Sequence, residues 1–378
     1  GCDASVALGQ RIGGIVEDLD ARTGANAGGA CFEQGDRLLV AGDRTGCLDE
    51  DTIGRAGGND GVDRLFRCLA WANLALLATF LFQVWLVQIV EIPGPGQALD
   101  GTGDLRSWLL LAMYPLAALA ACAVVFRTPV IGLREDADRI SDFNAWIVRG
   151  AFFAVLYVGL VDAAISFLRV EDMLAGLVGE DLATELGRPL YRGPVVHLPL
   201  VALGFLTAFF SRTLGFTWLA LMIVTAELLI VITRFVFSYE QSFMGDLVRF
   251  WYAALFLFAS AYTLLEEGHV RVDVFYAGFA RKTKGLVNAT GAILLGTALC
   301  WVTLVLGMGS KTSIIMAPLL NFEVTQTNFG MYVKYLMAGF LAIFAVTMMI
   351  QFAAMMLDAV ADRRGDPGHK EHAGASVS

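Results

Sequence analysis

The amino-acid sequence predicts an all-α polytopic membrane protein with about eight transmembrane helices and both termini in the cytoplasm. Of its 378 residues, 57% are hydrophobic and only 17% are charged, whereas soluble domains usually carry about 45–50% apolar and roughly 25% charged residues. Several stretches are apolar over the roughly 20 residues that a helix needs to cross a bilayer. Positive charges concentrate in alternate loops. This excess of apolar side chains requires lipid as its solvent.

The predicted spans are separate apolar stretches that begin after residue 60. They cover residues 66–90, 108–126, 147–169, 195–211, 217–237, 247–265, 286–309 and 333–358. The fourth is the shortest, and only the sequence SRTLGF separates it from the fifth. Because an open sheet leaves backbone groups unsatisfied in lipid, we expect each stretch to be a helix.

The loop charges predict the orientation of these helices. Basic residues occur after the second, fourth, sixth and eighth spans: Arg127, Arg134, Arg139, Arg212, Arg271, Arg281, Lys282, Lys284, Arg363 and Arg364. The gap after the first span has one arginine, and the gap after the third is mainly acidic. Since cytoplasmic loops carry the excess of Lys and Arg, this asymmetry predicts that both ends are cytoplasmic.

The chain divides into four predicted regions. Residues 1–60 are rich in Gly, Asp and Ala without periodicity, which is typical of a disordered tail. Residues 61–216 and 217–360 each hold four predicted helices, and residues 361–378 form a polar cytoplasmic tail that we also expect to be disordered. The net charge of −9 comes without a dense basic stripe, which argues against a nucleic-acid partner. The six cysteines show no C-x-x-C spacing, so no metal site or other cofactor is predicted from them.

A charged run, AYTLLEEGHVRVDVFY, ends the sixth span. As a helix it places Glu267 four residues before Arg271 and His269 four before Asp273, so that each pair shares a face. As a strand, HVRVDV alternates cleanly, and Gly268 permits a break. Periodicity therefore does not decide the local structure.

Two hypotheses fit this run. Glu266, Glu267 and His269 could form a proton relay or metal site, or the run could be a charged collar that fixes the depth of the helix. His197 starts the fourth span on the outer side, while His269 ends the sixth on the inner side, so they cannot clamp one haem. The second hypothesis, a charged collar with a structural role, is favoured.

Two carboxyl groups lie near the middle of predicted spans. Asp162 and Glu227 are each followed seven residues later by an arginine, Arg169 and Arg234. Seven residues along a helix are about 10 Å, so each pair shares a face but cannot bond directly. An intramembrane carboxyl suggests a coupling-ion or proton site. The alternative is a carboxyl that is protonated or hydrogen-bonded to another helix or a partner, and it is favoured because only Gly159 offers a helix break nearby.

Charges also gather at the outer turn between the fifth and sixth spans. Arg234, Asp246 and Arg249 could bridge one another, or they could contact a partner protein, and both alternatives remain open. Trp251 and Tyr252 are typical of aromatic anchors at the membrane interface.

These charged positions carry a resemblance to a known family. The segment ITRFVFSYEQSFMGDLVRFWYAALFLFASAYTLLEEGHVRVDVFY resembles the first two helices of the small membrane subunit of tripartite ATP-independent periplasmic (TRAP) transporters. The residues that correspond to the family pattern are Arg234 with Phe235, Asp246 with Arg249 and Phe250, and Glu267, Gly268, Arg271 and Asp273. The resemblance covers about residues 217–360, and residues 61–216 add four helices to the four of the family.

The resemblance implies a role in transport rather than an enzyme activity. In such systems, in the bacterial inner membrane, a periplasmic solute-binding protein captures an organic anion, most often a carboxylate. A separate large membrane subunit carries the substrate and sodium sites. The small subunit is a scaffold that braces the large one. The charged run would then orient the small subunit and its cytoplasmic turn.

Two other classes of function have less support in the sequence. A self-sufficient ion-coupled transporter or channel would need broken helices and polar midplane groups in corresponding halves, for which Asp162 and Glu227 are the only support. A membrane enzyme or redox subunit would need a catalytic set or paired histidines, and the positions of the histidines argue against one.

Overall fold

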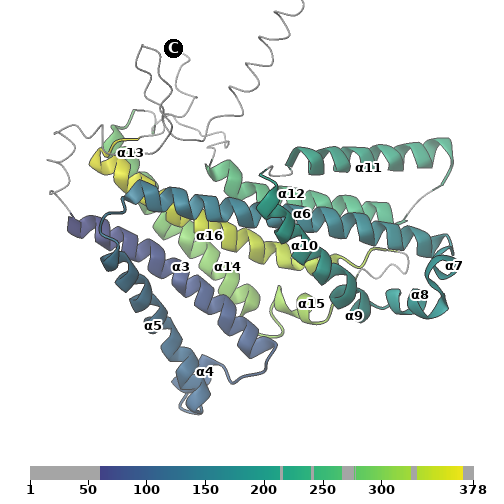
Figure 1. The fold of residues 1–378 in the computed structure, drawn as a ribbon, viewed down its shortest axis with the longest axis horizontal. Helices are drawn as coiled ribbons and strands as arrows, with labels where there is room; N and C mark the ends of the chain where they lie inside the picture. Colours follow the sequence, from purple (N-terminus) through teal and green to yellow (C-terminus); the bar gives the residue numbers. More distant parts are fainter. Residues whose placement is uncertain are drawn as a thin grey trace, which may run out of the picture. The chain divides into compact units, whose positions relative to one another are not determined.

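The computed structural model describes residues 60–212, 216–239, 242–265, 276, 278–324 and 330–368. Within these ranges every regular element is a helix, and eight helical segments are long and apolar enough to cross a membrane (Figure 1). Their elements are α3 (Asp60–Gln88), α5 (Leu105–Arg127), α6 (Leu133–Val170), α9 (Pro189–Arg192) with α10 (Leu198–Phe210), α11 (Phe216–Val236), α12 (Ser242–Leu265), α13 (Arg281–Gly291) with α14 (Ala298–Met308), and α16 (Lys334–Arg364). The predicted all-α class with eight spans is confirmed, whereas the orientation of the termini stays a prediction.

Two spans contain a π-helical turn. The segment η1 (Gly193–His197) joins α9 to α10, and η2 (Ala292–Thr297) joins α13 to α14. Short helices lie in the connections: α4 (Pro95–Leu99), α7 (Leu174–Val178), α8 (Glu180–Leu186) and α15 (Met316–Leu320). Gly179 separates α7 from α8 with a φ of 88°, a left-handed conformation that favours glycine.

The helix α6 is longer than its predicted span because its charged first half is also helical. The prediction that Arg134 and Arg139 lie in a loop is wrong, because both residues belong to α6. Arg139 pairs with Glu135 one turn earlier at 2.7 Å, and Arg134 reaches Asp362 of α16 at 2.7 Å. The acidic residues of the first turn also favour a helix start, since they lie at the positive end of the helix dipole.

A buried ion pair joins α3 to α6. Arg67 Nε lies 2.6 Å from Asp136 Oδ2, and both side chains are almost fully buried. Arg67 also donates to the carbonyl and hydroxyl oxygens of Thr128, at the end of α5. Trp71 Nε1 donates to the same carboxylate at 3.1 Å. This network fixes three helix ends to one another.

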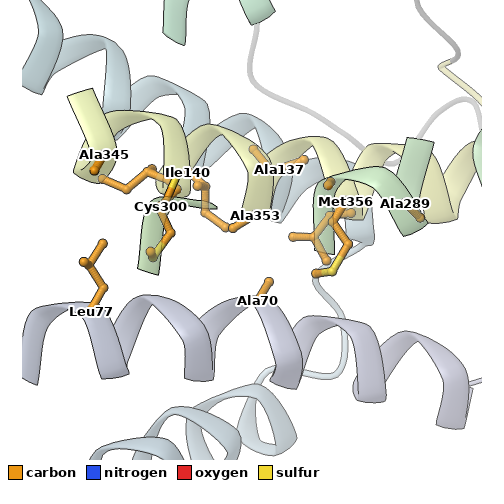
Figure 2. Close-up of a cluster of buried hydrophobic side chains, with 14 of the residues drawn as sticks. Ala70, Leu77, Ala137, Ile140, Ala289, Cys300, Ala345, Ala353 and Met356 are labelled. Atoms are coloured by element: carbon orange, nitrogen blue, oxygen red, sulfur yellow. The ribbon is translucent and has the colours of Figure 1, made fainter. Parts of the chain in front are cut away.

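One hydrophobic cluster is built from helices on both sides of residue 216. Figure 2 shows the small and medium side chains that fill it. They come from α3, α6, α13, α14 and α16, and include Ala70, Leu77, Ala137, Ile140, Ala289, Cys300, Ala345, Ala353 and Met356. Small side chains let helix backbones approach closely. The helices α3 and α16 therefore share a core, and the division into regions 61–216 and 217–360 stays a prediction.

A second cluster packs the other half of α6 against α11, α12 and α16. Trp251 of α12 is 2% exposed and donates through Nε1 to the carbonyl oxygen of Val155 at 3.2 Å. The interpretation of Trp251 as an interface anchor is therefore wrong, because Gly159 leaves space for the indole inside the bundle. Tyr252, the next residue, is exposed.

Replacement of Gly159 by alanine is expected to destabilise the chain. The new Cβ would lie 2.2 Å from Trp251 Nε1, and such overpacking typically costs about 1–3 kcal/mol. Gly245 of α12 is the matched control, because a Cβ there meets nothing within 4 Å. Thermal unfolding in detergent should show a loss for Gly159→Ala and no loss for Gly245→Ala. Equal melting of the two variants would contradict the close contact.

Candidate functional site

The most deeply buried charged cluster surrounds Asp162 of α6. Asp162, Arg192 and His197 have fully buried side chains. Oδ1 of Asp162 accepts from Arg192 Nη1 at 2.9 Å and lies 3.0 Å from His197 Nε2. Oδ2 accepts the backbone N–H of Tyr332 at 2.9 Å. Both carboxylate oxygens are thus held by groups from two other segments, the α9–η1 span and the residues just before α16.

Local helix geometry brings the donors to this carboxylate. Asp162 and Ser166 lie one helical turn apart on α6, and Arg192 Nη1 is 3.5 Å from the Ser166 hydroxyl. Arg192 and His197 are five residues apart and flank or end the π-helical turn η1. A π-helix bonds residue i to residue i+5, so this spacing lets both side chains reach one face. Arg192 Nε also donates to the carbonyl oxygen of Leu186 at 2.8 Å.

His197 joins Asp162 to α16 through its two ring nitrogens. Its Nδ1 lies 2.8 Å from the hydroxyl of Tyr335 in α16. With the proton on Nε2, the ring donates to Asp162 and its Nδ1 accepts from Tyr335. The carboxylate of Asp162 is paired with the guanidinium group of Arg192 at 2.9 Å. This tautomer is assigned from the hydrogen-bond partners.

Tyr332 links this cluster to the ends of α6 and α8. Its hydroxyl donates to the carbonyl oxygen of Gly187 at 2.8 Å. Arg192 and Arg169 lie over its ring, at 4.2 Å and 4.8 Å from the centroid, an arrangement in which a cation is attracted to an aromatic face. Arg169 also bonds the Tyr332 hydroxyl and the carbonyl oxygen of Gly330. Asp162 and Arg169 do not pair directly, and both hold the segment that precedes α16.

Asp246 of α12 holds the neighbouring residue of that segment. Its Oδ2 accepts from the backbone N–H of Met331 at 3.2 Å, next to the N–H that Asp162 accepts. Asp246 also lies 3.8 Å from Arg249, whose side chain is exposed. Arg234 is exposed on α11 and forms no ion pair with another described residue. Two carboxylates therefore fix consecutive backbone groups just before α16 begins.

Glu227 occupies a different environment from Asp162. It is exposed near the middle of α11, and among the described residues no hydrogen bond or ion pair engages it. Val224, Leu228 and Val231, on the same side of the helix, are also exposed. The structure does not bring the two intramembrane carboxyls together.

The predicted charged collar lies outside the described residues. It comprises Glu266, Glu267, Gly268, His269, Arg271 and Asp273. Within the described part of the chain, no group of three or more His, Cys, Asp or Glu side chains could hold a metal ion.

Polar contacts also form between groups near the helix ends on the predicted outer side of the membrane. Lys311 pairs with Glu91 at 2.5 Å, and this hydrogen bond and charge lower the pKa of the Glu91 carboxyl. Tyr239 bonds Glu171, and this hydrogen bond to a carboxylate raises the pKa of the phenol. The N–H of Ser107 lowers the pKa of Asp104 by bonding its carboxylate at the start of α5. All of these groups lie on the predicted outer side.

Sequence reasoning did not identify most members of the Asp162 cluster. Arg192, His197, Tyr332 and Tyr335 each stand at the edge of an apolar stretch, where polar residues are ordinary. The one local feature of the sequence that indicates a polar site is a second polar residue, Ser166, one turn from Asp162 on the same helix face. The partners themselves are 26 or more residues away along the chain.

Comparison with known families matches one part of the chain. Residues 221–362 match the family model described as tripartite ATP-independent periplasmic transporters, DctQ component. This confirms the resemblance over α11 to α16, and α3 to α10 lie outside the matched range. No match was found among curated proteins or among solved structures.

Proposed function

We propose that this chain, whose residues 221–362 match the family model of the DctQ component of TRAP transporters, is the small membrane subunit of such a transporter. In this proposal α3 to α10 enlarge the scaffold, both termini face the cytoplasm of a bacterium, and the chain lies in its inner membrane. A separate large subunit carries the substrate and sodium sites, and a periplasmic protein delivers an organic anion, typically a carboxylate. The family match is the observation that carries the proposal.

The hydrogen bonds of the Asp162 carboxylate support a scaffold rather than a self-sufficient transporter. Its carboxylate oxygens already accept from Arg192, His197 and Tyr332. A sodium site needs several converging oxygens, whereas this carboxylate is surrounded by donors. The cluster is suited to fixing helix ends, which is what a subunit that braces a moving partner requires.

The exposed face of α11 supports a protein partner within the membrane. Glu227 is exposed there among apolar side chains. A charged side chain at the centre of a lipid-facing helix costs about 3 kcal/mol on insertion scales. A helix of the large subunit that presents a hydrogen-bond donor would remove this cost. We therefore assign the face around Glu227 to that contact.

Replacement of Glu227 by leucine tests this assignment. If the face meets a donor on the large subunit, Glu227→Leu should weaken retention of that subunit about tenfold, as the loss of a charge-assisted hydrogen bond predicts. If the face meets lipid, leucine should leave retention unchanged. Leu228→Ala, one residue away, controls for a general change of this surface. Retention is measured by quantitative mass spectrometry after mild detergent extraction.

The proposed function itself is tested by what co-purifies with the tagged wild-type chain from its native membrane. A larger polytopic protein in stoichiometric amount is the expected result. Glu267→Ala and Arg271→Ala, in the proposed collar, should reduce complex yield and anion uptake. Purification of the chain alone, together with sodium- or proton-driven anion transport by that chain in liposomes, would contradict the proposal.

A further inference from the structure

The connection between α14 and α16 holds an aromatic side chain in an unusual backbone conformation. Phe322 has a φ of 46°, in the left-handed region that bulky L-residues rarely adopt. It follows the last residues of α15, and the N–H of Glu323 donates to the carbonyl oxygen of Pro318 at 3.0 Å. Helix ends of this kind usually have glycine at the left-handed position. A phenylalanine there therefore carries backbone strain.

The ring of Phe322 fills a slot that a neighbouring helix leaves open. A Cβ atom on Gly193, in the π-helical turn η1, would lie 2.3 Å from Cδ1 of this ring. The ring also packs edge to face against Tyr335 of α16, with ring centroids 5.1 Å apart. The absence of a side chain at Gly193 thus makes room for the aromatic contact.

This slot lies directly beside the Asp162 cluster. Gly193 stands between Arg192 and His197 in the chain, and the Tyr335 hydroxyl is 2.8 Å from His197 Nδ1. His197 is fully buried, whereas Phe322 is only partly buried. The ring therefore contacts both elements that enclose His197, and it remains in part accessible to solvent.

The other attachments of this segment are weak. The carbonyl oxygen of Glu323 accepts from the N–H of Tyr335 at 3.0 Å, and its side chain pairs with Lys334. Both side chains of that pair are 45% exposed, and an exposed ion pair adds little stability. One aromatic contact and one backbone bond thus oppose the strain at Phe322. Local opening here requires much less free energy than unfolding of the helix bundle.

We propose that Phe322 is a latch that closes the Asp162 cluster to water from the predicted outer side and opens while the bundle stays folded. When the ring leaves its slot, residues 321–323 move away from α16 and water reaches the His197–Tyr335 pair. The strained backbone favours the open state, and the aromatic contact favours the closed one. A glycine would fit the backbone but would leave the slot empty. The latch does not depend on the proposed transport function.

Modification of His197 by diethyl pyrocarbonate tests the latch in the full chain in mild detergent, since this reagent modifies an imidazole that solvent reaches. The rate is followed by peptide mass spectrometry. Phe322→Ala should accelerate the modification about tenfold, with a melting temperature close to that of the wild type. Phe237→Ala is the matched control, because Phe237 is an exposed aromatic residue on the same predicted side. It should keep the wild-type rate.

Gly193→Ala provides a second variant that leaves Phe322 in place. Its Cβ would occupy the slot, so the modification of His197 should again accelerate about tenfold. Gly176→Ala on α7, where a Cβ meets nothing within 4 Å, should have no effect. Phe322→Gly tests the strain, and it should melt no lower than Phe322→Ala because glycine accepts the left-handed backbone. A lower melting temperature for Phe322→Gly would overturn the assignment of strain.

The dependence on denaturant separates the latch from global unfolding. Local opening exposes little surface, so 1 M urea should leave the wild-type rate of modification unchanged. A rate that urea raises as strongly as it raises global unfolding would overturn the latch. Equal rates for the wild type and Phe322→Ala would show that the ring does not cover His197. Equal acceleration in Phe237→Ala would overturn the assignment to this slot.

Discussion

Replacement of Asp162 by alanine is expected to produce the largest loss of stability of any single change in the predicted outer half of the protein. The variant leaves Arg192 buried with no counter-ion, and removes the acceptor for His197 and for the N–H of Tyr332. Removing one partner of a buried ion pair typically costs about 3–5 kcal/mol. The start of α16 should loosen, because the segment before it loses one of its two carboxylate contacts.

Thermal unfolding of the purified chain in detergent measures this effect. Glu227→Ala is the matched control, because this carboxyl is exposed and its loss should barely change the melting of the isolated chain. Asp162→Asn keeps hydrogen-bonding capacity without the charge and should fall between alanine and the wild type. A fully stable Asp162→Asn variant that loses anion uptake would contradict the structural role and favour an ion-coupling role.

Replacement of Arg67 by methionine is expected to have a comparable effect at the other end of the bundle. Asp136 would then be a buried carboxylate whose remaining donor is Trp71, and Thr128 would lose both of its bonds from the guanidinium. The expected loss is again about 3–5 kcal/mol. Because Thr128 ends α5, the packing of α5 on α3 should weaken with it.

The double variant Arg67→Met with Asp136→Leu separates the loss of the pair from the cost of an uncompensated charge. Apolar side chains of similar volume often replace a buried ion pair at little cost. The double variant should therefore melt well above Arg67→Met alone. Chemical denaturation of all three proteins under one set of detergent conditions provides the comparison. If the double variant is as unstable as the single one, the hydrogen bonds to Thr128 rather than the charge balance hold these helices.

The Asp162 cluster and the Arg67 network explain how the helices outside the family-matched residues 221–362 are joined to those inside them. One cluster joins α6 and the α9–α10 span to the start of α16. The Arg67 network joins α3 and α5 to α6. The added helices are thus attached to the matched ones through α6, which packs along α16 in both hydrophobic cores. They are also attached through α3, which shares the first core with α14 and α16. The scaffold proposed for the transporter would gain rigidity from these attachments.

The class of protein and the number of spans are predictable from the amino-acid sequence alone. Length and hydrophobicity of a stretch are local properties, and lipid demands a helix from any such stretch. The charged run that resembles the family was likewise readable residue by residue, and residues 221–362 match that family. The helical structure of the first half of α6 was not predicted, because this half is charged and hydropathy identifies only apolar helices.

Which polar residues contact one another becomes visible only in the folded chain. Asp162 and Glu227 look alike in sequence, each a carboxyl within an apolar stretch with an arginine seven residues later. One is fully buried among donors from two other segments, and the other is exposed on α11. The difference arises because α6 packs on several sides while α11 packs on one. Burial depends on the neighbours of a helix face, and those neighbours are distant in the sequence.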